Sequence, residues 1–140
     1  MPLPDIKPYL RRAQYHETDQ MGIIHHATYV KWLEEARIDF LEQLGVDYST
    51  LEKMGLVSPI VEVSCQYKRM VRFGDSVSIA LHVKKYTGVK LVLGYTVTDA
   101  VSGALCTTAE TTSCFMNGEG SIISLKKEFP AIHELFSPFA

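Results

Sequence analysis

One helical segment followed by several long strand segments restricts the fold of this chain more than any other feature. Between residues 27 and 44, apolar residues recur at steps of three and four, which places them on one face of a helix. They are Tyr29, Leu33, Ala36, Phe40 and Leu44. Trp32 and Ile38 lie outside this face, so we expect the helix to be covered on more than one side. Gly45 is the predicted C-terminal cap.

Residues that favour β-strands dominate the rest of the chain. Segments rich in Val, Ile, Thr and Tyr predict strands, several of them with alternating apolar and polar residues. These strands span 56–70, 76–86, 90–99 and 104–116, after a first strand at 6–15. Turn signals such as Gly74-Asp75 and Thr87-Gly88 lie between them, so consecutive strands are expected to be antiparallel. Short helices are predicted at 49–54, capped by Ser49, and at 126–136.

This order of elements predicts an α+β fold in one domain spanning residues 1–140. The composition, 46% hydrophobic and 21% charged, is ordinary for a globular protein. A net charge of -2 argues against a partner that is nucleic acid, because sequence-independent binding needs a basic excess. No stretch approaches the ~20 apolar residues of a membrane span, and residues 1–12 lack the apolar run of a signal peptide.

The three cysteines give an indication of the compartment. Cys65, Cys106 and Cys114 are scattered, odd in number and form no C-x-x-C pair. Such a set suits a reducing environment better than a secreted disulfide framework. We therefore expect a cytoplasmic protein.

A polar loop directly before the long helix is the candidate site. Asp19 lies in this loop, close to a helix start whose first backbone N–H groups have no partner within the helix. Such groups stabilise developing negative charge, and a carboxylate can attack a carbonyl or activate water. Together they are two parts of an acyl-transfer site. The alternative is that Asp19 is a plain loop acid or a helix cap.

Other chemistries find little support in the sequence. No G-x-S-x-G, P-loop, G-x-G-x-x-G or H-E-x-x-H motif is present. His16, His25 and His26 lie near one another, but adjacent residues of an extended chain point in opposite directions and no cysteine is close. We expect neither a metal nor a cofactor.

The segment YHETDQMGIIHHATY, residues 15–29, followed by Trp32-Leu33-Glu34, resembles the signature of hot-dog-fold acyl-CoA thioesterases. The likeness is closest to the 4-hydroxybenzoyl-CoA thioesterase group and its YbgC-like branch, and the order of elements agrees over roughly residues 6–125. It implies a curved antiparallel sheet wrapped around one long helix. It also implies hydrolysis of an acyl-CoA to free acid and CoA, in a homodimer or homotetramer whose active sites are shared between subunits.

The resemblance assigns roles to individual residues of the loop. Asp19 becomes the catalytic carboxylate, and the backbone N–H of His26 polarises the thioester carbonyl. The His26 side chain holds the water, orients Asp19, or is only a hydrogen-bonded cap. Gly22 lets the loop turn tightly beside the bound substrate.

The helix is expected to contribute further residues. Tyr29 and Trp32 either line the acyl pocket or belong to the core. Glu34 or Glu35 is the reserve candidate for the base, the alternative being a solvated or structural acid. Glu34 also pairs by spacing with Arg37 at i, i+3.

The phosphates of CoA call for basic residues. Lys84, Lys85 and Lys90 flank the turn at Thr87-Gly88 and are the predicted contacts. A second basic group flanks another bend and consists of Lys68, Arg69 and Arg72. The alternative for both groups is a solvated surface.

Three other readings stay open at this point. A hot-dog dehydratase or hydratase acts on the same thioesters, usually through a His with an acid on the helix, which the Thr-Asp-Gln-Met-Gly loop argues against. A non-catalytic acyl-CoA-binding module keeps the fold without the chemistry, and a plain structural dimer leaves the motif unexplained. The acyl group is not specified by the sequence, and its carrier is either CoA or an acyl carrier protein.

Overall fold

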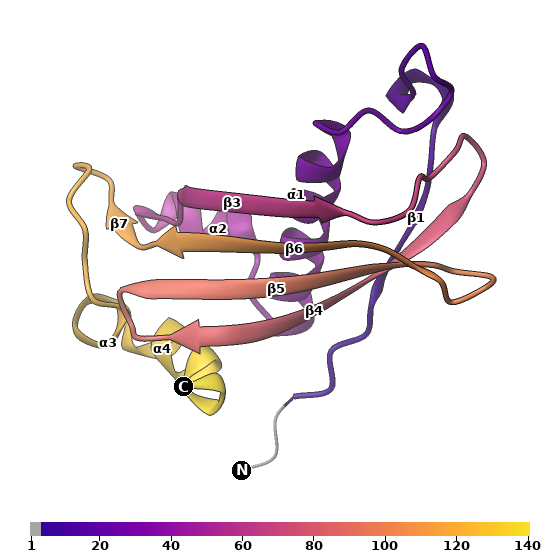
Figure 1. Cartoon of the computed structure of the whole chain (residues 1–140). Coiled ribbons are helices and arrows are strands. Elements are labelled where there is room, and N and C mark those ends of the chain that lie inside the picture. The colour runs from indigo at the N-terminus through magenta and orange to yellow at the C-terminus, as the bar shows by residue number, and fades with distance from the viewer. Residues whose placement is uncertain (1–3) are drawn as a thin grey trace.

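A curved antiparallel sheet packs on one long helix in this computed structural model, which describes residues 4–140 (Figure 1). The helix, α1, spans Thr28–Gln43 and lies behind the sheet in the view of Figure 1. Its most deeply buried side chains include Trp32, Leu33 and Phe40, in one cluster with Leu93 and Val97 of the sheet. The predicted α+β hot-dog architecture is therefore confirmed.

The five strands of the main sheet are arranged in the order β1-β4-β5-β6-β3. Their bounds are Tyr9–Arg12 for β1, Ser76–Tyr86 for β4, Lys90–Asp99 for β5, Leu105–Cys114 for β6 and Ile60–Tyr67 for β3. All neighbouring strands pair antiparallel. β3 is the edge strand beside β6, and most of its residues are exposed.

The long helix follows its prediction closely. The predicted range 27–44 is one residue longer at each end than α1. Gly45 follows with a φ of 90°, a left-handed conformation that glycine adopts without a steric penalty. The cap expected there is confirmed, as is the burial of Trp32 outside the main apolar face.

Proline residues account for two places where the predicted boundaries were wrong. The strand predicted at 56–70 is two strands, β2 (Leu56–Val57) and β3, because Pro59 lies between them and cannot donate to a ladder. The helix predicted at 126–136 is likewise two, α3 (Leu125–Glu128) and α4 (Pro130–Phe136), followed by a 3₁₀ turn at Ser137–Phe139. Phe129, which precedes Pro130, has a φ of -137°, outside the helical region.

Further boundaries differ from expectation, and among them β1 begins at Tyr9 instead of residue 6 and β3 ends at Tyr67 instead of residue 70. β1 ends at Arg12 instead of residue 15, because a 3₁₀ turn, η1 (Tyr15–Glu17), follows it. The strand predicted at 104–116 is β6 plus the short β7 (Met116–Asn117), which pairs with β2 in a separate sheet. The short helix α2 spans Tyr48–Lys53, and its cap is Asp47 instead of Ser49, since the Asp47 carboxylate accepts from the Ser49 N–H.

β3 and β4 are consecutive in the chain but do not pair, because β6 and β5 lie between them. The connection, residues 68–75, therefore crosses the end of the sheet. There it meets the loop that precedes α1, and the Ile24 N–H donates to the Val71 carbonyl at 2.8 Å. An isolated bridge between Ile23 and Arg72 adds a second link. This crossing brings two basic residues, Lys68 and Arg69, to the candidate loop.

No helix within residues 4–140 has the length and apolar character needed to cross a bilayer.

Candidate active site

Asp19 is held by a turn of its own backbone and does not cap α1. Its Oδ1 accepts from the Met21 N–H at 2.8 Å, which is the geometry of an Asx turn. Within residues 4–140, Oδ2 accepts no hydrogen bond. Asp19 is half-buried. The turn orients one carboxylate oxygen, and the other has no partner among the described residues.

The loop around Asp19 is closed at its base. The Asp19 N–H donates to the Ile23 carbonyl at 2.8 Å, and Thr18 and Ile24 form an antiparallel bridge. Gly22 turns the chain back with a φ of 77°, and its N–H donates to the Asp19 carbonyl at 3.0 Å. The expected tight turn at Gly22 is present, while its contact with substrate stays a prediction.

The backbone at the start of α1 offers a free donor beside this loop. The Ala27 N–H donates to His25 Nδ1 at 3.1 Å, and the Thr28 N–H donates to the His25 carbonyl at 2.9 Å. The His26 N–H, in contrast, has no acceptor among residues 4–140. This is the backbone group to which the resemblance assigns polarisation of the carbonyl.

The two adjacent histidines do not point apart, so that expectation was wrong. The chain turns into α1 at this point instead of staying extended, and the rings of His25 and His26 stack with centroids 4.2 Å apart. Within the described residues, no group of three or more His, Cys, Asp or Glu side chains is placed to hold a metal ion.

Asp19 and His26 line the same open cleft, which encloses about 480 Å³. Ile24 and Tyr29 form its buried wall. Tyr67, from the end of β3, packs against Tyr29 with ring centroids 5.0 Å apart. The cleft thus combines a carboxylate, a free N–H and an apolar wall, which is what a thioester with an acyl group requires.

Tyr67 also fixes the start of α1. Its hydroxyl donates to the His26 carbonyl at 2.8 Å, so β3 is tied to the peptide that precedes the helix. Burial raises the pKa of Tyr67 to about 12, with the neighbouring Cys65 acting in the same direction. Burial, with Cys106 adding to it, raises the pKa of Tyr29 to about 12 as well. Both hydroxyls are therefore protonated donors near neutral pH.

Lys68, Arg69 and Met70 complete the mouth of the cleft. All three side chains are exposed, and the two cations belong to the second basic group recognised in the sequence. Arg72 lies next to the loop through its bridge with Ile23 but does not line the cleft.

The other predicted group, Lys84, Lys85 and Lys90, lies at the opposite end of the sheet. β4 begins at Ser76, opposite Arg12, and Lys85 is nine residues further along. At ~3.4 Å per residue this is about 30 Å. Lys84 instead pairs with Glu110, with 3.3 Å between the charged atoms. Within one chain these lysines do not reach the cleft, and their contact with CoA stays a prediction.

Trp32 does not line the cleft of its own chain either. It is fully buried, and its indole N–H donates to Glu17 Oε2 at 3.0 Å.

Of the two reserve acids, Glu35 accepts from Tyr9 and Arg11, while Glu34 pairs with Arg37 at 2.7 Å as its spacing predicted.

Glu17 is a buried acid near the site, and the sequence alone did not single it out. Its carboxylate is 7% exposed and receives hydrogen bonds from Arg11, Gln14 and Trp32. Its position two residues before Asp19 in the same motif was the available signal.

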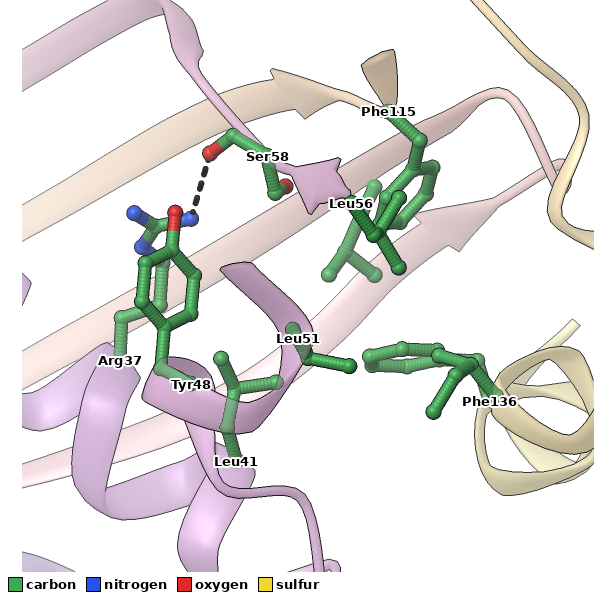
Figure 2. A pocket seen from close by; sticks show the side chains of 10 residues that line it. Arg37, Leu41, Tyr48, Leu51, Leu56, Ser58, Phe115 and Phe136 are labelled. Carbon is green, nitrogen blue, oxygen red and sulfur yellow. Dashed lines mark hydrogen bonds between the residues drawn. The ribbon is translucent and has the colours of Figure 1, made fainter. Parts of the chain in front are cut away.

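A second, more enclosed cavity lies between α1, α2, β2 and α4 (Figure 2). Leucine and phenylalanine side chains dominate its walls, and Arg37 is its one charged residue, donating to the Ser58 carbonyl at 3.1 Å. The free volume is about 10 Å³, roughly the space of one water molecule. The lining contains the hydroxyls of Tyr48 and Ser58 but no carboxylate or imidazole that could act as a base, so the Asp19 cleft is the better candidate.

The chain is similar to known proteins over most of its length. The family model of the thioesterase-like superfamily matches residues 13–134. The chain is 32% identical over 124 residues to YneP of Bacillus subtilis (strain 168), provisionally named an acyl-CoA thioesterase; the match covers 89% of this chain and 90% of YneP. It is 25% identical over 89 residues to the acyl-CoA thioester hydrolase YbgC of Escherichia coli O157:H7, covering 64% of this chain and 66% of YbgC.

Among solved structures, the chain is similar to the DHNA-CoA thioesterase of Staphylococcus aureus. The TM-score is 0.90 at 32% sequence identity, and the match covers 94% of this chain and 89% of that one. The likeness therefore extends over nearly the whole fold.

Proposed function

The chain belongs to the thioesterase-like superfamily and is a thioester hydrolase, and we propose that it cleaves acyl-CoA with Asp19 as the catalytic carboxylate. The observation that carries this proposal is the shared cleft, in which Asp19 lies with the unpartnered N–H of His26 beside a buried apolar wall. A carboxylate with one free oxygen and a donor for the developing oxyanion are the two groups that thioester hydrolysis needs.

In the proposed reaction the thioester carbonyl oxygen accepts from the His26 N–H, and the acyl group packs against Ile24 and Tyr29. Asp19 either takes a proton from the attacking water or attacks the carbonyl itself to form an anhydride that water then opens. Both routes consume one water and release the free acid and CoA as its thiol. The His26 imidazole, at the mouth of the cleft, holds the water or orients Asp19.

Asp19→Asn tests the assignment, because asparagine can keep the Asx turn while losing the negative charge. We expect kcat for acyl-CoA hydrolysis to fall at least ~100-fold with the fold retained. Asp47→Asn is the matched control. The Asp47 carboxylate likewise accepts from the N–H of the residue two positions later, Ser49, but Asp47 lies at the start of α2. A D19N enzyme that releases thiol at the parent rate would contradict the proposal.

The alternative activities are separated by the same assay. Addition of water to crotonyl-CoA without release of thiol would indicate a hydratase. Tight binding of acyl-CoA with no thiol release from the parent protein would indicate a binding module. A panel of acyl-CoA and acyl carrier protein thioesters of different acyl length and aromaticity then defines the substrate.

We assign CoA phosphate binding first to Lys68 and Arg69, because they lie at the mouth of the cleft. Replacing both with alanine is expected to raise KM about 10-fold with little change in kcat, as for the loss of uniform substrate binding. Replacing Lys85 and Lys90 with alanine tests the other basic group. Because these lysines lie far from the cleft of their own chain, their contact with CoA requires a second subunit.

A homo-oligomer with shared sites is the proposed assembly, and the edge strand β3 supports it. Val61 and Val63 are 57% and 42% exposed, and the outer edge of β3 has no neighbour in the sheet. A long exposed apolar edge is a surface that proteins normally cover. Because Tyr67 lies on the same strand, a second copy on β3 would adjoin the cleft. All three cysteines are free, which suits the proposed cytoplasmic location.

A further inference from the structure

We propose that Glu17 is a positioning residue, which holds the Asp19 loop and the start of α1 in their reactive arrangement through a buried polar network. The proposal rests on the proposed function of Asp19. Glu17 does not line the cleft, and it acts through the two ends of the loop that carries the candidate catalytic groups.

The Glu17 carboxylate joins three separate parts of the chain. Oε1 accepts from the Gln14 N–H at 2.8 Å and from Arg11 Nη1 at 3.1 Å. Oε2 accepts from Arg11 Nη2 at 2.8 Å and from the Trp32 indole N–H at 3.0 Å. One side chain therefore connects β1, the turn after it and the second turn of α1.

The backbone of Glu17 holds the other end of the same loop. Its carbonyl accepts from the His25 N–H at 2.8 Å. Asp19 is two residues after Glu17, and His26 is one residue after His25. Both candidate catalytic groups thus extend from points that are fixed at Glu17.

Glu17 is not itself a base for the reaction. Both of its oxygens are engaged, with four N–H donors in total, and it is 7% exposed. Burial acts to raise the pKa of this carboxyl, but the hydrogen bonds from Gln14, Trp32 and Arg11 outweigh burial, so the pKa lies below its ordinary value of 4.5. It stays ionised, as an acceptor for four donors must.

Arg11 extends the network to the exposed side of α1. Its Nε donates to Glu35 Oε1 at 2.8 Å, and its guanidinium lies 5.7 Å from the centre of the Trp32 ring. Arg11 therefore pairs with two acids, the buried Glu17 and the more exposed Glu35. Charge-assisted hydrogen bonds of this kind hold side chains in a defined geometry.

The other anchors of the loop are mostly backbone hydrogen bonds and bridges, so few buried side chains besides Glu17 hold it. Ile24 is its one deeply buried apolar side chain between Thr18 and His26, while Met21 is 73% exposed. A shift of about 1 Å in a reacting group can cost about 100-fold in rate. Loosening Glu17 is therefore expected to reduce the rate of the chemical step more than the binding of substrate.

Glu17→Gln is the direct test, because glutamine fits the same space but cannot accept from all four donors. We expect kcat to fall about 10- to 100-fold while KM stays within about 3-fold, measured at a temperature where the variant is fully folded. Trp32→Phe removes one of the four donors together with part of a fully buried ring, and it is expected to lower kcat about 3- to 10-fold in the same way.

Tyr95→Phe is the matched control for stability. It also removes one buried hydrogen bond, that between the Tyr95 hydroxyl and Thr111 Oγ1 at 2.8 Å, but in the sheet. We expect it to lower the Tm and to leave kcat unchanged. If E17Q does not fold, W32F decides the question by the same comparison.

The proposal is overturned if E17Q lowers the Tm but keeps the parent kcat, since Glu17 is then only structural. If E17Q does not fold, the same result for W32F overturns it. It is also overturned if Y95F loses kcat to the same extent, since destabilisation then accounts for the effect. An inactive D19N beside a fully active E17Q rejects this inference alone. A fully active D19N rejects the proposed function itself.

Discussion

At the scale of single residues, the site depends on side chains that orient one another through backbone groups. Asp19 is aligned by the Met21 N–H, and the peptide before α1 is aligned by Tyr67 and Glu17. All of these hydrogen bonds join groups of the protein itself. A preorganised arrangement of this kind lowers the reorganisation that the chemical step requires.

Gly22→Ala is expected to weaken both the fold and the site. The φ of 77° costs a residue with a Cβ about 1–2 kcal/mol, although no atom lies within 4 Å of the added methyl group. Urea unfolding should show this loss, with a fall in kcat. Gly118→Ala is the control, because Gly118 has equally open surroundings without a positive φ. Equal stability of the two variants would contradict the prediction.

Glu17 also predicts a dependence of stability on pH. The pKa of Glu17 is lower in the folded state than the ordinary value of 4.5. Its stabilising contribution to the free energy of unfolding is therefore present above about pH 4.5 and is lost as the pH falls through the folded-state pKa. The free energy of unfolding should therefore differ most between the parent and E17Q near neutral pH, with the difference shrinking in acid. Urea titrations across this range measure it, and a difference that stays constant would refute the prediction.

The sequence predicts Asp19 and Gly22 because they lie in one continuous motif. It does not predict Glu17, since the partners that bury it, Arg11 and Trp32, come from two other elements. Their contact depends on how β1 and α1 pack, and no periodic pattern specifies that packing. The stacked rings of His25 and His26 were missed for a related reason, the turn of the chain into α1.

At the scale of elements, β4 and β5 were predicted to the residue and the other strands were not. β4 and β5 are bounded by glycine turns and buried on the helix side, so their local pattern and their environment agree. β3 and the C-terminal helices contain or adjoin prolines whose effect is local, and the pairing of β2 with β7 depends on a distant segment. The placement of β3 beside β6 likewise could not be read from chain order.

The C-terminal helix α4 is an integral part of the core. Phe136 is 2% exposed and packs against Tyr86 and Phe115. Phe136→Ala is expected to cost about 3–5 kcal/mol of unfolding free energy because it leaves a cavity. Phe73→Ala, at a side chain that is 54% exposed, is the control and should cost much less. A small effect at both positions would mean that α4 is not part of the cooperative unit.

At the scale of the whole molecule, the exposed edge of β3 predicts assembly. Val63→Lys is expected to shift the protein toward monomer in light scattering and to lower its activity, because a charge at a paired edge is costly to bury. Val101→Lys, at a turn residue that is 93% exposed, should change neither. An unchanged mass for the Val63 variant would place the interface elsewhere.

The order of helix before sheet has a consequence for synthesis on the ribosome. α1 ends at Gln43, whereas β6, the last long strand of the sheet, ends at Cys114. At about 5–20 residues per second, the nascent helix waits several seconds for the strands that cover it. During that interval Leu33 and Phe40 have no complete sheet to pack against, so the emerging chain presents an apolar helix that molecular chaperones can bind.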